Sequence, residues 1–332
     1  MSVGELLTSL SFGTFHVQLV EQPTTVISLV ADGATEAEIE LLARQVMALP
    51  AVIVATGADA SALASAADVV LARDEDRGSN RGWLQAIVDG VHRAPLAAAA
   101  LVMLMRAHPG RHDIQAGLIA ESATYSMLQA GPEFRSWRST NSPRRPRETT
   151  PAVHLERIGA TLLVTLDRPH VRNALNAAMQ AELVEAFGIA LADPSLTTVA
   201  LRGNGPGFCS GGDLDEFGAF RDPSSAHVVR VSRSPARLAA AITDRLEVHL
   251  HGACAGSGIE IPAFARRVVA APDTVISLPE LRLGLIPGAG GTVSVAGRIG
   301  RQRTVQLVLS GAEIDARTAL HWGLVDEISA AD

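Results

Sequence analysis

Apolar positions along the chain follow two spacings, one typical of strands and one typical of helices. Residues 24–30 and 51–55 are short apolar runs that predict strands. Over residues 35–48 the apolar positions recur every three or four residues, which predicts an amphipathic helix. Residues 54–72 then predict a short helix and another strand. This order predicts a small α/β unit near the N-terminus.

Residues 83–129 predict successive helices with no strands between them. Apolar spacing indicates helices over 83–91, 95–106 and 114–129. Residues 139–152 (STNSPRRPRETTPA) are polar, basic and proline-bearing, which is typical of an exposed linker.

Beyond this linker the alternation of strand and helix returns. Strands are predicted over 160–166 and 198–202, with a helix over 179–192 between them. Residues 311–328 predict a capped helix and a last strand. Such alternation predicts parallel βαβ units and places the chain in the α/β class.

Composition narrows the range of partners. The 332 residues are 47% hydrophobic, which supplies a sizeable core and argues against disorder. The net charge of −7 disfavours nucleic acid as the main partner. All 28 basic residues are arginines, so that a bound phosphate would be held by guanidinium groups, backbone N–H groups or helix ends. We find neither metal-ligand spacing, nor a signal peptide, nor an apolar run of membrane length, and therefore expect a cytoplasmic protein without a metal or a membrane partner.

Two carboxylates lie beside glycine-rich turns. HGACAGSGIE (251–260) ends on Glu260, and SLPELRLGLIPGAGGT (277–292) contains Glu280. Glu260 follows a predicted strand over 246–250 and opens a helix, where free N–H groups gather. The helix dipole alone would favour an isolated glutamate there. N–H donors together with two carboxylates point instead to chemistry on a carbonyl compound that develops negative charge on oxygen.

Four segments in register carry a resemblance to a known family. They are LDRPHVRNALN (166–176), GFCSGGDLDEF (207–217), GACAGSGIE (252–260) and LPELRLGLIPGAGGT (278–292). On these segments the chain from about residue 155 to 328 resembles the crotonase (enoyl-CoA hydratase/isomerase) superfamily. The resemblance implies a crotonase-like ββα spiral core with an N-terminal α/β-plus-helical extension.

The resemblance also implies an activity and a site. It implies an acyl-CoA hydratase that acts on a 2-enoyl-CoA through an enolate, with no cofactor beyond the coenzyme A of the substrate. The acid–base pair that handles the added water would be Glu260 and Glu280, with neither assigned as acid or base. The enolate oxygen would be held by the backbone N–H groups of Gly212 and Ser257. Substrate and CoA contacts are implied for four further residues: His170, Val171, Ser210 and Asp213. A plain turn at Gly212, with Asp213 capping the next helix, is the structural alternative.

Other functions stay open at this point. One is a different crotonase reaction, namely isomerisation or a cofactor-free oxygenation of an aryl-CoA, which the long N-terminal extension motivates. Another is a non-catalytic subunit that binds CoA esters or serves in assembly, because the family usually has glycine where Ser257 stands. The resemblance further implies a homotrimer or hexamer.

The same resemblance suggests a domain organisation. We expect an extension over 1–22, a decayed crotonase-like half over 23–138, the linker over 139–152 and the catalytic core over 153–332. Crotonases continue beyond their Gly-Leu-Val element with about three more helices, and residues 88–106 and 113–134 look like those helices. They would cover the core and replace the C-terminal helices. The alternative is an unrelated N-terminal domain that packs independently.

Overall fold

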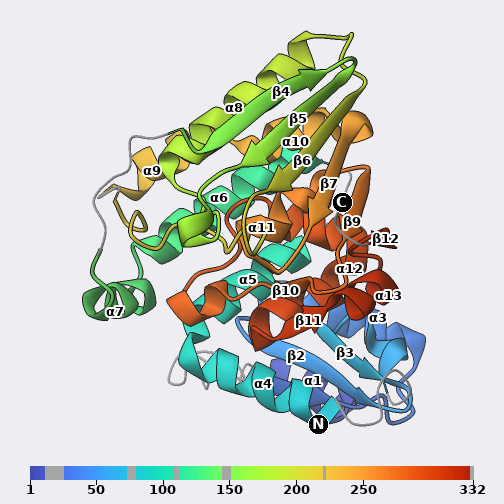
Figure 1. Ribbon diagram of the computed structural model, residues 1–332. Coiled ribbons are helices and arrows are strands. Elements are labelled where there is room, and N and C mark those ends of the chain that lie inside the picture. Colours follow the sequence, from blue (N-terminus) through green and yellow to red (C-terminus); the bar gives the residue numbers. More distant parts are fainter. Residues whose placement is uncertain (12–25, 73–79, 108–112, 144–150, 220–221, 330–332) are drawn as a thin grey trace. The chain divides into compact units, whose positions relative to one another are not determined.

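The structure is a computed structural model that describes residues 1–11, 26–72, 80–107, 113–143, 151–219 and 222–329 (Figure 1). Its residues form two compact units. The first lies within 1–109, 279–286 and 300–312, and the second within 110–278, 287–299 and 313–332. Parts of the predicted extension (12–22) and of the predicted linker (144–150) lie outside the described residues. The division into 23–138 and 153–332 stays a prediction.

The first unit is built on a parallel three-stranded sheet with strand order β1-β2-β3. Its elements are β1 (Val26–Leu29), β2 (Val52–Gly57), β3 (Val69–Ala72), α1 (Val3–Ser11), α3 (Glu36–Gln45), η1 (Ala60–Leu63), α4 (Asn80–Arg93), α5 (Pro95–Ala107) and η5 (Glu280–Leu283). Helix α3 begins at a capping box, in which the Thr35 hydroxyl accepts from the Glu38 N–H and the Glu38 carboxylate accepts from the Thr35 N–H. The predicted strands at 24–30 and 51–55 and the helix at 35–48 are confirmed to within a few residues.

A buried ion cluster holds the first unit together. The Asp68 carboxylate is fully buried and accepts hydrogen bonds from the Ile53 N–H (2.9 Å) and the Arg106 Nε (2.8 Å). The Arg301 guanidinium lies 3.3 Å from the same carboxylate. The Arg106 guanidinium also donates to backbone carbonyls, those of Leu49 (2.6 Å) and Ala51 (2.7 Å) among them. The cluster thus joins the sheet, the turn after α3 and helix α5.

The second unit contains a six-stranded sheet with strand order β12-β9-β7-β6-β5-β4. Its strands are β4 (Val153–Ile158), β5 (Thr161–Leu166), β6 (Thr198–Gly203), β7 (Leu246–Leu250), β9 (Arg267–Ala270) and β12 (Glu327–Ile328). Strands β4 and β5 form an antiparallel hairpin, and the other neighbours pair in parallel. Helix α8 (Ala177–Ala192) lies along β4 and β5 (Figure 1). The strands predicted over 160–166, 198–202 and 246–250 and the helix over 179–192 are confirmed.

A second, three-stranded sheet makes the chain of this unit wind as a spiral. It has the order β11-β10-β8, with β8 (Ala253–Ala255), β10 (Val275–Ser277) and β11 (Glu313–Asp315). After β7 and after β9 the chain crosses from the large sheet to the small one and then enters a helix, first as β7–β8–α11 (Ser257–Glu260). The next pass runs through β9, β10 and α12 (Gly291–Ser310), which is interrupted at Gly300. This winding places the turns that follow the small-sheet strands close together.

Helices from before the predicted linker also belong to the second unit. Helix α6 (Ile114–Gln129) packs against α9 (Pro223–Ser232) and α10 (Pro235–Ala241), and α7 (Pro132–Thr140) follows it. The predicted helix over 114–129 is confirmed at both ends. Whether these helices replace the family's C-terminal ones stays a hypothesis.

Among the described residues no single helix is long and apolar enough to cross a membrane. The segments Arg81–Arg93 and Pro95–Ala107 reach that length only as a pair, which is bent by 112°. The apolar side chains of α5 are largely buried in the fold, Leu101 and Val102 completely so.

The ion cluster of the first unit yields a stability prediction. Asp68→Ala leaves the guanidinium groups of Arg106 and Arg301 without their buried counter-charge, and we expect a loss of about 3–5 kcal/mol in the free energy of unfolding. Urea unfolding of the full chain measures it. The matched control is Glu40→Ala, which breaks an exposed pair with Arg44 and is expected to cost less than about 1 kcal/mol. Equal losses in the two variants would contradict the assignment.

Candidate active site

Two glycine-rich segments of the second unit lie side by side. The Cys209 N–H donates to the Ala253 carbonyl (3.2 Å), and the Ala255 N–H donates to the Cys209 carbonyl (3.0 Å). Gly258 has no room for a side chain, because a Cβ there would lie 2.2 Å from the Cys209 carbonyl oxygen. Glycine is therefore needed at 258 for the turn at 208–212 to approach the start of α11.

Each of these segments presents a backbone N–H for which the described residues provide no acceptor. Ser257 is the first residue of α11 and follows Gly256, whose backbone (φ 50°, ψ −121°) suits only glycine. Gly212 lies in a turn fixed on both sides, since the Leu175 N–H donates to Gly211 (2.8 Å) and the Asp213 N–H donates to Leu175 (3.0 Å). Within the described part of the chain, neither the Gly212 nor the Ser257 amide donates a hydrogen bond. Such amides are available to a ligand oxygen.

The Glu260 side chain lies at the start of another helix, α12. It is 2% exposed, and its Oε2 accepts from the N–H groups of Ala289 (2.8 Å) and Gly291 (2.9 Å). A Cβ at Gly291 would lie 2.7 Å from the Glu260 Cγ, so that only glycine lets the carboxylate approach. The Ser294 hydroxyl in turn donates to the Glu260 carbonyl (2.6 Å). The predicted place of Glu260 in the first turn of α11 is confirmed, and the carboxylate gains the dipole of α12 as well.

Glu280, the second predicted catalytic residue, opens the short helix η5 after Pro279 and is buried. Its carbonyl accepts from the Leu285 N–H (3.1 Å), which closes the turn at Gly284. Glu280 belongs to the first compact unit, whereas Glu260 belongs to the second. The convergence of the two carboxylates therefore stays a prediction.

Three of the predicted CoA-contacting residues lie on two loops that are hydrogen-bonded to each other. His170 and Val171 form η2 (Pro169–Val171), and the His170 side chain is exposed. The Ser210 N–H donates to the Arg172 carbonyl (2.9 Å), and its hydroxyl donates to the Val171 carbonyl (3.3 Å). Arg172 and the next residue adopt left-handed φ angles of 53°, which turn the chain sharply here.

Asp213 has a structural role in its turn. Its carboxylate forms a buried ion pair with Arg168 (3.0 Å), with both side chains 4% exposed, and accepts from the Asp215 N–H (3.2 Å). It caps no helix, because the next one, α9, begins at Pro223 and is capped by Asp222. The alternative in which Asp213 is a helix cap is thus wrong, and its contact with substrate stays a prediction.

The sequence analysis did not identify one further buried carboxylate, that of Glu121 on α6. It is 2% exposed; its Oε1 accepts from the Gly290 N–H (2.7 Å), and its Oε2 accepts from the Thr292 N–H (2.9 Å) and hydroxyl (2.6 Å). Burial raises the pKa of Glu121 to about 7, although these hydrogen bonds and the charge of Arg230 oppose the rise. The available signal was a single acidic residue on the apolar face of the predicted helix, between Leu118 and Tyr125.

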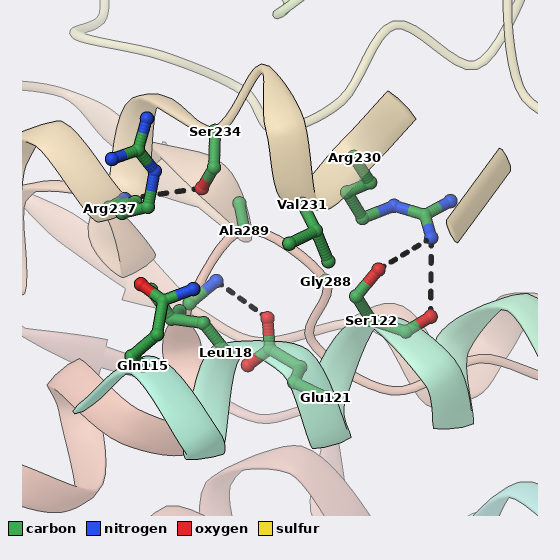
Figure 2. A pocket seen from close by; sticks show the side chains of 11 residues that line it. Gln115, Leu118, Glu121, Ser122, Arg230, Val231, Ser234, Arg237, Gly288 and Ala289 are labelled. Carbon is green, nitrogen blue, oxygen red and sulfur yellow. Dashed lines mark hydrogen bonds between the residues drawn. The ribbon is translucent and has the colours of Figure 1, made fainter. Parts of the chain in front are cut away.

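A small hollow lies beside these groups. Figure 2 shows the Glu121 side chain rising from α6 toward the turn at 288–290, with Arg230 opposite. The hollow measures about 20 Å³ and has room for roughly one water molecule. Arg230 bonds to the hydroxyls of Ser122 (3.3 Å) and Ser126 (2.8 Å) and lies 4.5 Å from the ring centre of Tyr125. The wall also includes Gln115, Ser234, Arg237 and Ala289.

Two other kinds of site can be examined among the described residues, namely a metal site and a reactive cysteine. In the described ranges no group of three or more His, Cys, Asp or Glu side chains is arranged to hold a metal ion. The two cysteines are buried and free. Burial raises the pKa of the Cys209 thiol to about 11, which leaves it protonated and a poor nucleophile at neutral pH.

Comparisons with known proteins show which family the sequence and the fold resemble. The family model described as enoyl-CoA hydratase/isomerase matches residues 156–332. A 2,3-dehydroadipyl-CoA hydratase of Escherichia coli (strain K12) is 36% identical over 171 residues, which are 52% of this chain and 66% of that protein. An enoyl-CoA isomerase/hydratase of Mycosarcoma maydis is 30% identical over 179 residues, which are 50% of this chain and 64% of that protein.

A solved structure extends the comparison to the fold. The crystal structure of an enoyl-CoA hydratase from Thermoplasma volcanium GSS1 matches with a TM-score of 0.51 and 32% identity, over 55% of this chain and 73% of that one. The predicted fold class, a crotonase-like core with an extra N-terminal α/β region, is confirmed. The chain spans about two thirds of the length of the two curated relatives.

Glu121 makes stability depend on pH. Because its pKa in the folded state (about 7) lies above the ordinary value of 4.5, the folded state keeps a proton that the unfolded chain releases. Its contribution is complete below pH 4.5 and is lost as the pH rises to about 7, with a total on the order of 3 kcal/mol. Glu121→Gln should flatten this decline in urea midpoints measured from pH 4.5 to 7.5. The control is Glu185→Gln, which removes an exposed carboxylate on α8 and should retain the decline. A Glu121→Gln curve parallel to that of the unmodified protein would contradict the shift.

Proposed function

The chain belongs to the enoyl-CoA hydratase/isomerase family, and from this premise we propose that it adds water to the double bond of a 2-enoyl-CoA thioester through an enolate intermediate. The family binds acyl-CoA esters, and the proposal names one reaction of that class. The observation that carries it is the pair of acceptor-free amides at Gly212 and Ser257, on two segments held in direct contact.

The amides of Gly212 and Ser257 can stabilise the negative charge that the reaction creates on the thioester carbonyl oxygen. When a nucleophile adds to Cβ of a conjugated thioester, electrons move to the carbonyl oxygen and an enolate forms. Two preorganised N–H donors stabilise that oxygen without having to reorient during the step. The glycine contact between Gly258 and Cys209 fixes their spacing, and the buried ion pair of Asp213 holds the Gly212 turn.

The proton transfers fall to the two glutamates. A carboxylate takes a proton from the attacking water, whose oxygen bonds to Cβ, and a carboxylic acid delivers a proton to Cα. Atoms and charge balance, because the substrate gains one water in total. Glu260 lies three residues after Ser257, in the first turn of the same helix, and is assigned one of these roles. Glu280 is assigned the other. The two contacting loops that carry His170 and Val171 and Ser210 are assigned to the coenzyme A part of the substrate. Asp213, three residues after Ser210, is assigned a contact with the substrate.

Substitution of either glutamate tests the reaction. Glu260→Gln and Glu280→Gln keep size and polarity but can no longer exchange a proton with the substrate. We expect each to lower kcat by roughly 10² to 10⁴-fold, with little change in KM. Loss of the conjugated thioester absorbance measures turnover of crotonyl-CoA, longer enoyl esters and 2,3-dehydroadipyl-CoA, which is included because one relative is named for it. Glu185→Gln is the control. If neither active-site variant lowers turnover of any accepted ester, the hydratase assignment fails.

Other measurements separate the remaining candidate reactions, because the conjugated absorbance is lost both when water is added and when the double bond moves out of conjugation. An isomerase would shift the double bond without taking up water, and an oxygenase would consume oxygen in proportion to an aryl-CoA substrate. A non-catalytic subunit would bind esters in calorimetry and turn over none of them.

The contact between the two amide-bearing segments provides a second test. Gly258→Ala places a methyl group against the Cys209 carbonyl and should push the segments apart. Because each donor in such a pair is typically worth about 10² to 10³-fold, we expect kcat to fall by at least about 10²-fold. The matched control is Gly188→Ala on α8, where an added Cβ has nothing within 4 Å. Retained activity in a folded Gly258→Ala variant would overturn the proposed role of these amides.

A further inference from the structure

The hydroxyl of Ser257 is a buried polar group that the fold itself hardly uses. Ser257 is 7% exposed, and among the described residues its Oγ has a single polar contact, with the Cys209 Sγ at 3.9 Å. A thiol is only a weak donor and a weak acceptor, and this one also faces the Gly211 carbonyl at 3.9 Å. Buried hydroxyls are as a rule hydrogen-bonded, because burial without a good partner costs free energy. The Ser257 hydroxyl therefore keeps most of its hydrogen-bonding capacity for another group.

This hydroxyl lies between the two segments that carry the Gly212 and Ser257 amides. Cys209 belongs to the segment 207–212 and Ser257 begins α11 on the facing segment, so that their side-chain contact spans the space between the two. The backbone hydrogen bonds of Cys209 with Ala253 and Ala255 hold the segments at this distance. The amide and the hydroxyl of Ser257 are joined through Cα and Cβ alone, so both can donate to the same ligand oxygen.

The neighbouring groups leave the hydroxyl proton available. The Cys209 thiol stays protonated, because burial raises its pKa to about 11, and it therefore offers no thiolate to bind that proton. The Glu260 carboxylate is directed to the start of α12, where it accepts from the N–H groups of Ala289 and Gly291. A negatively charged oxygen that forms between the segments would be a stronger acceptor than the sulfur.

We propose that the Ser257 hydroxyl is a third donor to the enolate oxygen, beside the amides of Gly212 and Ser257, and hence a catalytic residue. In the free protein it lies against the Cys209 sulfur, and with substrate bound it turns about the Cα–Cβ bond to the thioester carbonyl oxygen. The bond strengthens as negative charge develops on that oxygen. The hydroxyl keeps its proton throughout, and the electron pair returns from oxygen when Cα is protonated. This inference rests on the proposed enolate chemistry and adds a residue to it.

Removal of the hydroxyl should affect catalysis more than folding. Because a hydrogen bond to a charged group is worth roughly 10 to 10²-fold, we expect Ser257→Ala to lower kcat for crotonyl-CoA by that factor with KM little changed. Its urea midpoint should not fall, because the hydroxyl has only a weak partner in the fold. Ser257→Cys keeps a side chain of similar shape but only a weak donor, and should lose activity in the same way.

A matched variant tests whether the serine acts only by packing against Cys209. Cys209→Ala removes the same contact from its other side and leaves the hydroxyl in place. It should retain most of the activity that Ser257→Ala loses. Gly188→Ala on α8 is the control for unchanged activity. Equal losses of kcat in Cys209→Ala and Ser257→Ala, with equal losses of stability, would assign the serine to packing and overturn the proposal.

A β-keto thioester tests the donor without any hydration reaction. Acetoacetyl-CoA loses its acidic α proton to form a stable enolate, whose near-ultraviolet band reports ionisation. Bound to the unmodified protein, it should ionise at a lower pH than in free solution. In Ser257→Ala we expect this midpoint to rise by roughly one to two pH units, the effect of one hydrogen bond to a charged group. Gly188→Ala should leave the midpoint unchanged.

The outcomes separate this inference from the proposed function. A raised midpoint in Ser257→Ala, in a protein that hydrates no enoyl ester, supports the third donor and overturns only the hydratase assignment. An unchanged midpoint overturns the third donor even if the protein proves to be a hydratase. If acetoacetyl-CoA does not bind to the unmodified protein, or ionises there at the pH of the free ligand, both the third donor and the enolate site are overturned.

Discussion

The start of helix α12 is the constraint on which the candidate site depends. A buried carboxylate needs hydrogen-bond donors, and the first turn of a helix offers several that have no partner of their own. The glycines at 290 and 291 make these donors reachable: a side chain at 291 would meet Glu260, and one at 290, where φ is 102°, would meet Phe264. The two glycines that end the Pro-Gly-Ala-Gly-Gly sequence are thus needed for Glu260 and Glu121 to be buried at this helix start.

The spiral of two sheets explains how such distant residues meet. Strands β6, β7 and β9 of the large sheet are followed by a bridge or strand at the small sheet, namely Cys209, β8 and β10. The glycine-rich turns follow these small-sheet positions and therefore lie at one edge, although about forty residues separate 212 from 257. Parallel strands whose ends face the same edge collect their loops in one place, which is where α/β proteins commonly bind ligands.

Much of this could be predicted from the sequence, and the exceptions have physical reasons. The helix at 114–129 and the strands at 160–166 and 246–250 were readable because their apolar spacing is regular. The acceptor-free amide of Ser257 was readable because glycine turns before a helix expose N–H groups in a predictable place. Helices α9 and α10 were not predicted, because α9 buries only Ala226 and α10 has only seven residues, too few to show a helical period. Glu121 was missed because its importance comes from a contact 169 residues away in the chain, with Gly290, which periodicity cannot show.

Glu121 also bears on how the two parts of the chain are related. A helix that only covered a finished core would need nothing but apolar residues along its inner face. Helix α6 buries Leu118 and Tyr125 there, but it also buries a carboxylate and a serine. Glu121 bonds to the start of α12, and Ser122 bonds to Arg230. A buried charged group is tolerated only where the neighbouring backbone is arranged to receive it, so α6 and the turn at 288–292 have complementary requirements. Helix α6 is therefore an integral part of the second unit, because its buried acid is received by the helix start that also holds Glu260. The origin of residues 23–138 as a decayed crotonase half stays a hypothesis.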